Sequence, residues 1–224
     1  MTQASELLMN RIAEGRQFRR NDMHPEFRIG SGEEDEGALI VEGHFTTFNE
    51  EYLLYRSNYY EVYEQIDAHA FDECDMSDVI MQYDHEGRVY AKNRNNTLQI
   101  SFDNIGGFMR ADLSKASDGK GLYNDIKNGL VDRMSFGFTV KKDKRLEEYD
   151  STRDVWIMHR CITKIRKLYD VSAVSIPAND GTDISARNFC DGAIAELEAE
   201  RLKAQMSIEA RRRLALKLRL MEEK

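Results

Sequence analysis

The feature that most constrains the fold is an alternating run at residues 133–140, Arg-Met-Ser-Phe-Gly-Phe-Thr-Val. Successive side chains of a β-strand point to opposite faces, so this run predicts a strand with one apolar face and one small, polar face. Ser135 and Gly137 share the polar face, where the missing side chain of Gly137 would leave room for an extended peptide beside the serine hydroxyl. Alternation reports only amphipathicity, so a half-buried strand with Ser135 facing solvent is the structural alternative.

Similar short apolar segments recur along the chain and are separated by turn residues. They predict strands at 38–48, 62–66, 79–83, 98–102, 108–113, 155–165 and 168–176. Helical patterns cover 6–19, 121–129 and 192–224, whereas the charged stretch 141–153 is typical of a loop. Short strands separated by turns, with a few helices between them, indicate a β-barrel or a sandwich with helices around it. We expect an α+β fold that is mostly β, a closed or partly open β-barrel surrounded by helices, with helical N- and C-terminal extensions.

Three segments follow from this pattern: a helical arm and acidic linker at 1–36, a β-barrel domain at 37–188 and a C-terminal helix at 189–224. The linker is expected because residues 29–37 combine glycine with a run of acidic side chains. The C-terminal helix is rich in Ala, Leu, Glu, Arg and Lys. Such a helix could lie on the core, form a solvated tail or serve as a docking handle for another protein.

Composition narrows the classes of function. The formal net charge of -8 argues against a dedicated nucleic-acid binder. No apolar run approaches the ~20 residues that span a bilayer, and residues 1–20 lack the apolar stretch of a signal peptide, so we expect an intracellular protein without membrane contact. The 3 cysteines include no Cys-x-x-Cys pair and the 5 histidines no His-Glu-x-x-His motif, so we expect neither a metal site nor a cofactor.

Ser135 can act as a nucleophile only if other residues activate it, because a serine hydroxyl needs a base and a group that orients the base. His85 follows a predicted strand in a turn and is a candidate base, although a single histidine in a turn is often incidental. Asp170 lies in an apolar strand on the face of Ser172, so its carboxylate must be paired or face a cleft. A structural salt bridge is the alternative for this acid, with Lys164, Arg166 or Lys167.

Several ordered blocks between residues 43 and 187 resemble the prohead maturation proteases of tailed bacteriophages, which look distantly related to the assemblin proteases of herpesviruses. The blocks are Gly43-His44-Phe45, Glu64-Gln65-Ile66 with His69-Ala70-Phe71, Asp84-His85-Glu86 with Gly87-Arg88, Gly129-Leu130 with Met134-Ser135-Phe136-Gly137-Phe138, and Leu168-Tyr169-Asp170-Val171-Ser172 with Pro177-Ala178. Each block is short, and the specificity lies in their order.

The resemblance implies that Ser135 is the nucleophile, His85 the general base and Asp170 the third catalytic residue. Phage enzymes often have glutamate at the third position and herpesvirus enzymes histidine, so aspartate is a departure. His159 competes for this role, but its surroundings do not match the family block. The sequence does not identify the oxyanion donors, for which backbone amides near Ser135 and the side chains of Arg133 and Arg166 are candidates.

The resemblance further implies a serine endopeptidase that acts in the host bacterial cytoplasm, inside the immature phage head. Its expected partners are the major capsid protein, whose scaffolding region it would cleave, and further copies of itself through self-cleavage and possible self-association. A non-catalytic capsid scaffold or assembly protein on the same fold is the alternative. An esterase is disfavoured because the Gly-x-Ser-x-Gly elbow is missing.

Overall fold

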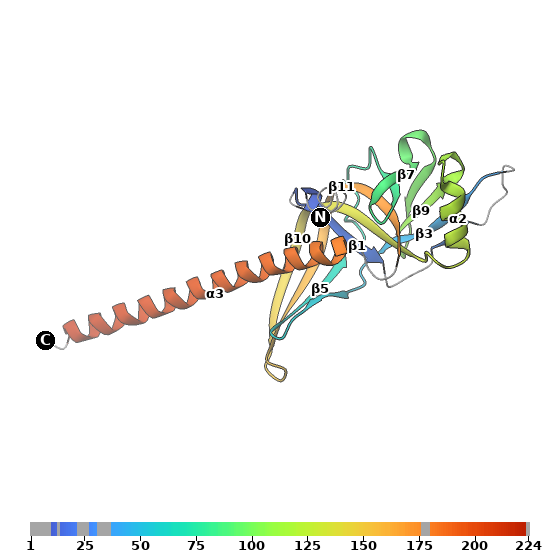
Figure 1. Ribbon diagram of the computed structural model, residues 1–224. Coiled ribbons are helices and arrows are strands. Elements are labelled where there is room, and N and C mark those ends of the chain that lie inside the picture. Colours follow the sequence, from blue (N-terminus) through green and yellow to red (C-terminus); the bar gives the residue numbers. More distant parts are fainter. Residues whose placement is uncertain (1–9, 13, 22–26, 31–36, 176–179, 223–224) are drawn as a thin grey trace. The chain divides into compact units, whose positions relative to one another are not determined.

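The computed structural model describes residues 10–12, 14–21, 27–30, 37–175 and 180–222. The chain divides into two compact units, Met1–Ala186 and Arg187–Lys224. Strands dominate the first unit and a single long helix forms the second (Figure 1). The expected α+β class with a strand majority and a helical C-terminus is therefore confirmed.

A seven-stranded sheet is built around a long hairpin, β10–β11, with strand order β1-β10-β11-β5-β4. β11 pairs in parallel with β5 along its first half and with β6 along its second half, and β7 pairs with β6. One strand therefore joins most of the sheet. The strands are β1 (Gln17–Asn21), β4 (Tyr52–Arg56), β5 (Tyr60–Ile66), β6 (Ile80–Tyr83), β7 (Glu86–Lys92), β10 (Arg133–Asp150) and β11 (Val155–Val174).

A four-stranded antiparallel sheet packs against it, with strand order β2-β3-β9-β8. The hydrophobic core lies between the sheets, where the ring of Phe45 from β3 meets the ring of Phe136 from β10 at 5.6 Å between centroids. Its strands are β2 (Arg28–Ile29), β3 (Ile40–Thr47), β8 (Leu98–Phe102) and β9 (Gly106–Asp112). The predicted hairpin at 98–113 corresponds to β8–β9 and is confirmed.

Helical segments flank the second sheet: η1 (Asn93–Asn95), η2 (Leu113–Lys115) and α2 (Gly119–Lys127). α2 buries Leu122 and Ile126, which lie four residues apart and so share one helix face. Gly129 follows with a φ of 70°, a conformation that glycine adopts without a Cβ penalty. The short helix predicted at 121–129 and its glycine stop are thus confirmed.

Neither sheet closes on itself within the described residues, so the predicted barrel is not confirmed. The first sheet ends in β1 on one side and β4 on the other, and the second ends in β2 and β8. β11 branches between β5 and β6, which extends one edge instead of curling the sheet back to β1.

Three local predictions are wrong in part. Residues 17–19 belong to β1 and not to a helix, because they pair with β10. The charged stretch 141–150 continues β10, and 155–174 form one strand where two were expected. The charges of residues 141–150 indicated a loop, but both faces of this outer part of β10 are largely solvated, so charged side chains are compatible with a strand there. The acidic linker lies largely outside the described residues, as does the strand end expected at Pro177.

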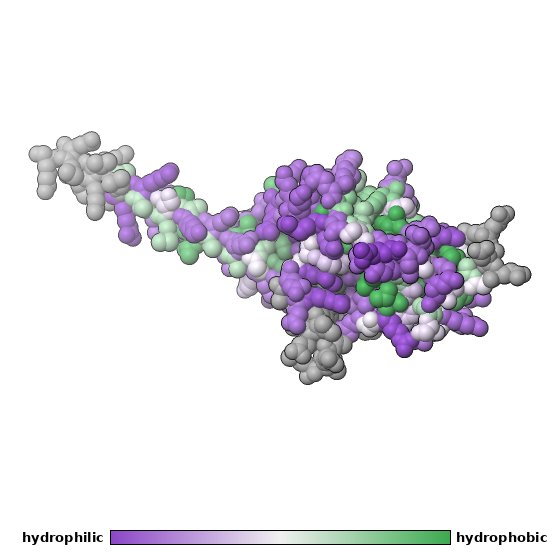
Figure 2. All heavy atoms as spheres, turned by 90° about the horizontal axis from the view of Figure 1, so that it is seen from above, coloured by the Kyte–Doolittle hydropathy of each residue, from purple (hydrophilic) through white to green (hydrophobic). Residues whose placement is uncertain are grey.

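α3 (Asp180–Glu222) is longer than the predicted helix and begins before it. Leu202, Met206 and Ile208 on this helix are exposed. Hydrophilic side chains cover most of the visible surface of the β-rich unit, and apolar side chains are scattered among them (Figure 2). No helix within the described residues combines the length and apolarity needed to cross a bilayer.

Candidate active site

The structure brings Ser135, His85 and Asp170 into one hydrogen-bonded row. Nε2 of His85 lies 2.6 Å from Oγ of Ser135. Nδ1 of the same ring donates to Oδ1 of Asp170. An ionised carboxylate only accepts hydrogen bonds, so the proton of the neutral imidazole sits on Nδ1 and Nε2 is free to accept from the hydroxyl. The arrangement can take a proton from the serine as a nucleophile forms.

Three strands of the seven-stranded sheet position these groups. Ser135 of β10 is paired with Ser172 of β11, and Gly137 is paired with Asp170. Because facing residues of an antiparallel pair project to the same side, the hydroxyl and the carboxylate emerge on one face. β6 pairs with β11 at Asp170 and so brings the β6–β7 turn, which carries His85, to that face.

The turn that presents His85 has an unusual backbone. Asp84 and His85 have φ angles of 50° and 61°, in the left-handed region. A carboxylate oxygen of Asp84 accepts from the backbone N–H of Ser175 at 3.1 Å, which ties the turn to the end of β11. Non-glycine residues rarely adopt this conformation and it often occurs at functional sites. The fold therefore holds the ring of His85 in place at a cost in local backbone energy.

Asp170 is deeply buried and acts as the acceptor of the row. Besides the imidazole, Oγ of Ser172 donates to its Oδ1 at 2.8 Å, whereas Oδ2 has no hydrogen-bond partner within the described residues. Burial raises the pKa of this carboxyl, but attraction to His85 and the bonds from His85 and Ser172 outweigh it, so the pKa lies below its ordinary value. Asp170 thus stays ionised beside the ring.

Gly137 has a different role from the one predicted. A Cβ at this position would collide with Oδ2 of Asp170 and would lie 2.9 Å from a ring carbon of Phe18. The missing side chain therefore makes room for the carboxylate and not for a peptide. The requirement for glycine here comes from close packing inside the site.

The row is sealed from solvent by β1, an element that the sequence reading missed. Ser135 is 0% exposed, and His85 and Asp170 are each 1% exposed. The ring of Phe18 lies 4.6 Å from the ring of His85, and the backbone carbonyl of Arg19 is 2.9 Å from Oγ of Ser135. The only sequence signal for this strand was one phenylalanine among polar residues, which is too short to identify a strand.

The two candidate arginine donors differ in their surroundings. Arg133 precedes Ser135 by two positions in β10 and therefore projects to the same face. Its Nε and Nη1 atoms are buried without a hydrogen-bond partner within the described residues, although Asp132 lies 3.8 Å from Nε. Arg166 is exposed. Of the two, Arg133 is the better placed to donate to an anion near the serine.

His159 and the basic residues considered for Asp170 lie elsewhere. His159 pairs with Leu146 in the outer part of the hairpin, and its ring bonds Glu51 at 2.8 Å. Lys164 is bound to Glu73 and Lys167 to Asp75. In the part of the chain that the structure describes, Asp170 pairs with His85 and forms no salt bridge with Lys164, Arg166 or Lys167.

A second buried cluster of charges lies on the other side of β1. Glu64 of β5 is 0% exposed and binds the guanidinium of Arg19 through two contacts, Nε–Oε1 at 2.6 Å and Nη2–Oε2 at 3.1 Å. Arg160 and the hydroxyl of Tyr52 bond the same carboxylate. Burial raises the pKa of Glu64, but the two guanidinium groups and these bonds bring it down to about 2.

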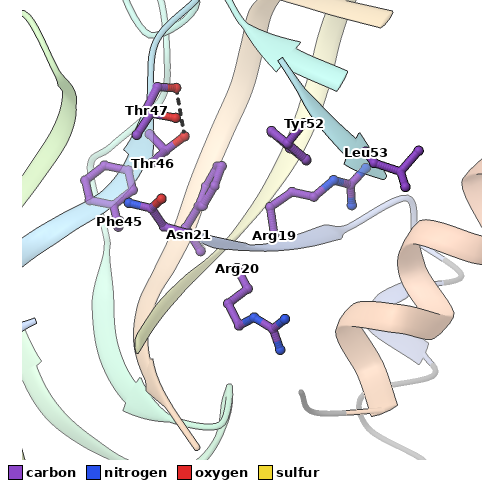
Figure 3. A pocket seen from close by; sticks show the side chains of 9 residues that line it. Arg19, Arg20, Asn21, Phe45, Thr46, Thr47, Tyr52 and Leu53 are labelled. Carbon is purple, nitrogen blue, oxygen red and sulfur yellow. Dashed lines mark hydrogen bonds between the residues drawn. The ribbon is translucent and has the colours of Figure 1, made fainter. Parts of the chain in front are cut away.

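A cavity of about 150 Å³ opens beside the end of β1. In Figure 3 the side chain of Arg19 extends toward Tyr52 and Leu53, whereas that of Arg20 points to the opposite side of the strand. Ser135 does not line this cavity. The cavity therefore lies beside β1 and does not give access to the hydroxyl of Ser135.

No cluster of metal-ligating side chains occurs in the part of the chain that the structure describes. The row of Ser135, His85 and Asp170 needs no metal to hold it together, because each contact is a direct hydrogen bond.

Comparison with known proteins gives the family. Neither the curated proteins nor the solved structures contain a match to this chain. The family described as caudovirus prohead serine protease matches residues 26–193, which include all three members of the row. That match covers most of the chain, and the chain therefore belongs to the caudovirus prohead serine protease family.

Proposed function

We propose that the protein is a serine endopeptidase in which Ser135 is the nucleophile, His85 the general base and Asp170 the group that orients the base. The observation that carries this proposal is the continuous hydrogen-bonded row from Asp170 through the imidazole to Oγ of Ser135. A nucleophile, a base and an acid in these contacts are what acyl transfer at a peptide bond requires.

The proposed reaction begins when Oγ of Ser135 attacks the carbonyl carbon of a substrate and Nε2 of His85 takes the hydroxyl proton. Asp170 stays ionised and stabilises the imidazolium, consistent with its lowered pKa. The tetrahedral intermediate collapses when Nε2 returns the proton to the departing amine, leaving an acyl group on Ser135. Water, deprotonated by His85, then attacks the ester and releases the acid and the free serine.

Arg133 is the proposed oxyanion donor. Its position in β10 puts it on the face of Ser135, and it has two buried nitrogens without a hydrogen-bond partner in the described part of the chain. A half-buried cation that is not fully paired would gain a partner when the oxyanion forms, and each such donor lowers a barrier by about 3 kcal/mol in other enzymes.

The proposed substrate is the scaffolding portion of the major capsid protein, together with the protease itself, inside the immature head in the infected bacterium. Membership of the prohead protease family supports this setting. The long α3 offers an exposed surface with apolar side chains for contacts during assembly, and self-association through it is part of the proposal.

Co-expression of the chain with the capsid protein encoded beside it tests the proposal. New capsid termini, mapped by mass spectrometry, are expected with the wild-type chain and not with Ser135→Ala. A fluorophosphonate probe provides a second readout, since labelling of Ser135 requires an activated serine. Unchanged processing by Ser135→Ala would refute the assignment of the nucleophile, and a non-catalytic assembly protein would show neither cleavage nor labelling.

A further inference from the structure

The nucleophile of an endopeptidase must be reached by a polypeptide, yet Ser135 has no exposed surface here. β1 is the edge strand of the seven-stranded sheet and runs antiparallel to β10, with Arg20 opposite Ser135. An extended peptide that adds to a sheet edge is a common mode of peptide recognition, because the backbone supplies the affinity and side-chain pockets supply the selectivity. β1 occupies the edge where such a peptide would pair.

β1 contacts both Ser135 and His85 in a way that would inhibit the reaction. Ser135 has a single hydroxyl proton and faces two acceptors, Nε2 of His85 and the carbonyl oxygen of Arg19 at 2.9 Å. A proton donated to the carbonyl of Arg19 is not donated to the base. Phe18 covers the imidazole on the same side. β1 therefore both excludes other peptides and competes for the proton that catalysis must move.

The side chain of Arg19 is recognised by a built pocket. Glu64 lies at its base and takes the guanidinium through two nitrogens, a geometry that suits arginine better than lysine. Arg160 divides its charge between Glu64 and Asp143, so Arg19 supplies a second cation to a fully buried carboxylate. A buried carboxylate that loses such a partner is costly, and a peptide replacing β1 would have to supply an equivalent group.

We infer that the β10 edge is the peptide-binding site, that β1 occupies it as an internal substrate mimic, and that Glu64 selects an arginine at the position of Arg19. This inference rests on the proposed protease function for its biological meaning. The family match begins at residue 26, so β1 precedes the matched region and adds to it. Cleavage of another chain then requires β1 to leave the edge.

Peptide binding tests the site without using catalysis. The probe is a fluorescein-labelled peptide with the sequence of residues 16–21, Arg-Gln-Phe-Arg-Arg-Asn, and its control has glutamine at the position of Arg19. The receptor is the full chain carrying Ser135→Ala, and Arg19→Gln to loosen β1. Fluorescence anisotropy should show that the arginine peptide binds about tenfold or more tightly than the control.

Adding Glu64→Gln to this receptor should bring the two affinities together, because the pocket loses its charge. Arg94→Gln, which alters an exposed ion pair with Asp78, is the matched control and should preserve the preference. Circular dichroism establishes that each receptor is folded. Failure of a folded receptor to bind the arginine peptide, or a preference that survives Glu64→Gln, would overturn the inference.

A reversible cross-link tests whether β1 must leave, and it spares both Arg19 and Glu64. Asn21 and Met134 face each other across β1 and β10, so Asn21→Cys with Met134→Cys can join the strands by a disulfide. Fluorophosphonate labelling of Ser135 should be about tenfold or more slower in the oxidised form than in the reduced form. Single-cysteine variants control for the native thiols, Cys74, Cys161 and Cys190.

Equal labelling of the oxidised and reduced forms would overturn the requirement for release of β1. Absence of labelling even in a chain that keeps Ser135 and carries Arg19→Gln to loosen β1 would instead contradict the proposed protease function. The peptide experiment would still decide whether the β10 edge and Glu64 recognise an arginine strand, so failure of the two proposals can be told apart.

Discussion

Two histidine–carboxylate pairs lie beside the β10–β11 hairpin, one at Asp170 and one at His159 of β11. They differ in burial and in the other contacts of the imidazole. His85 and Asp170 at the inner end each have 1% of the side chain exposed. His159 and Glu51 at the outer end have 33% and 35% exposed. The inner ring has a serine hydroxyl on its second nitrogen, whereas Nε2 of the outer ring lies 3.7 Å from a carboxylate oxygen of Glu148 and the ring stacks on Tyr63.

The comparison teaches that an imidazole and a carboxylate in contact do not make a site. Water screens the outer pair and competes for its hydrogen bonds, so its contribution to stability is small. Burial makes the inner pair directional, because each proton has few alternative partners and the charges interact strongly. The inner pair is therefore suited to transferring a proton, whereas the outer pair is an ordinary, weakly stabilising surface ion pair.

Removing the inner imidazole should have the largest effect. His85→Asn is the suitable change, because asparagine tolerates the left-handed backbone found at this position. Loss of the base should lower the rate of peptide cleavage by about 10⁶-fold, as in other serine proteases. The measurement is cleavage of a capsid-derived peptide, with thermal unfolding to verify the fold. Wild-type activity would remove His85 from the mechanism.

Asp170→Asn should reduce turnover by about 10⁴-fold while leaving the packing nearly unchanged. The amide of asparagine can donate to Nδ1, which moves the imidazole proton to Nε2 and prevents that nitrogen from accepting the proton of Ser135. Steady-state kinetics measure the effect. Normal turnover would shift the orienting role to another group, and His159→Ala in the same background would identify whether that histidine takes it.

Gly137→Ala probes the close packing around the inner pair. The added Cβ would collide with Asp170 and crowd Phe18, so displacement of the carboxylate should slow cleavage by about 100-fold. Overpacking should also cost about 1–3 kcal/mol of stability, measured by urea unfolding. Gly121→Ala in α2 is the matched control, since nothing lies within 4 Å of its Cβ, and it should cost neither activity nor stability.

Acid should weaken the inner pair through Asp170. The folded pKa of this carboxyl lies below its ordinary value of 3.8, so its contribution to stability is complete above about pH 4 and is lost as the pH falls through the folded pKa. Urea unfolding between pH 5 and 2 should show stability falling with pH, with a shallower fall in Asp170→Asn. An identical slope in the two proteins would show that Asp170 is not a source of the acid sensitivity.

His159→Ala should have the smallest effect. Its ion pair with Glu51 is partly exposed, and such pairs contribute about 0–1 kcal/mol, so stability should change within that range and activity should stay at the wild-type level. Added salt should reduce even this difference. A loss of cleavage comparable to that of His85→Asn would contradict the distinction between the two pairs.

Some of the site could be predicted from the sequence. The alternating run around Ser135 correctly indicated its strand, because strand periodicity is local and repeats every two residues. The resemblance singled out His85 and Asp170, which the structure brings into contact with each other and, through His85, with Ser135. Their proximity depends on the parallel pairing of β6 with β11, which no local pattern encodes.

Other parts could not be predicted because tertiary pairing decides them. Residues 17–21 have no strong strand propensity and become β1 through hydrogen bonds to β10. The charges of residues 141–150 in β10 indicated a loop, since a strand with two solvated faces lacks the apolar alternation that identifies strands. The barrel was expected from a succession of short strands separated by turns, and this local pattern does not encode how β11 shares its edge between β5 and β6.

The wide spacing of the row along the chain has a consequence for biosynthesis. His85 and Ser135 are 50 positions apart, and His85 and Asp170 are 85 apart. A nascent polypeptide that has not yet delivered β11 carries the alcohol and the imidazole but no partner strand to bring β6 beside β10. The hydrogen-bonded row can therefore form only after translation has passed β11, so an unfinished chain on the ribosome still has the three side chains, or those already made, apart from one another.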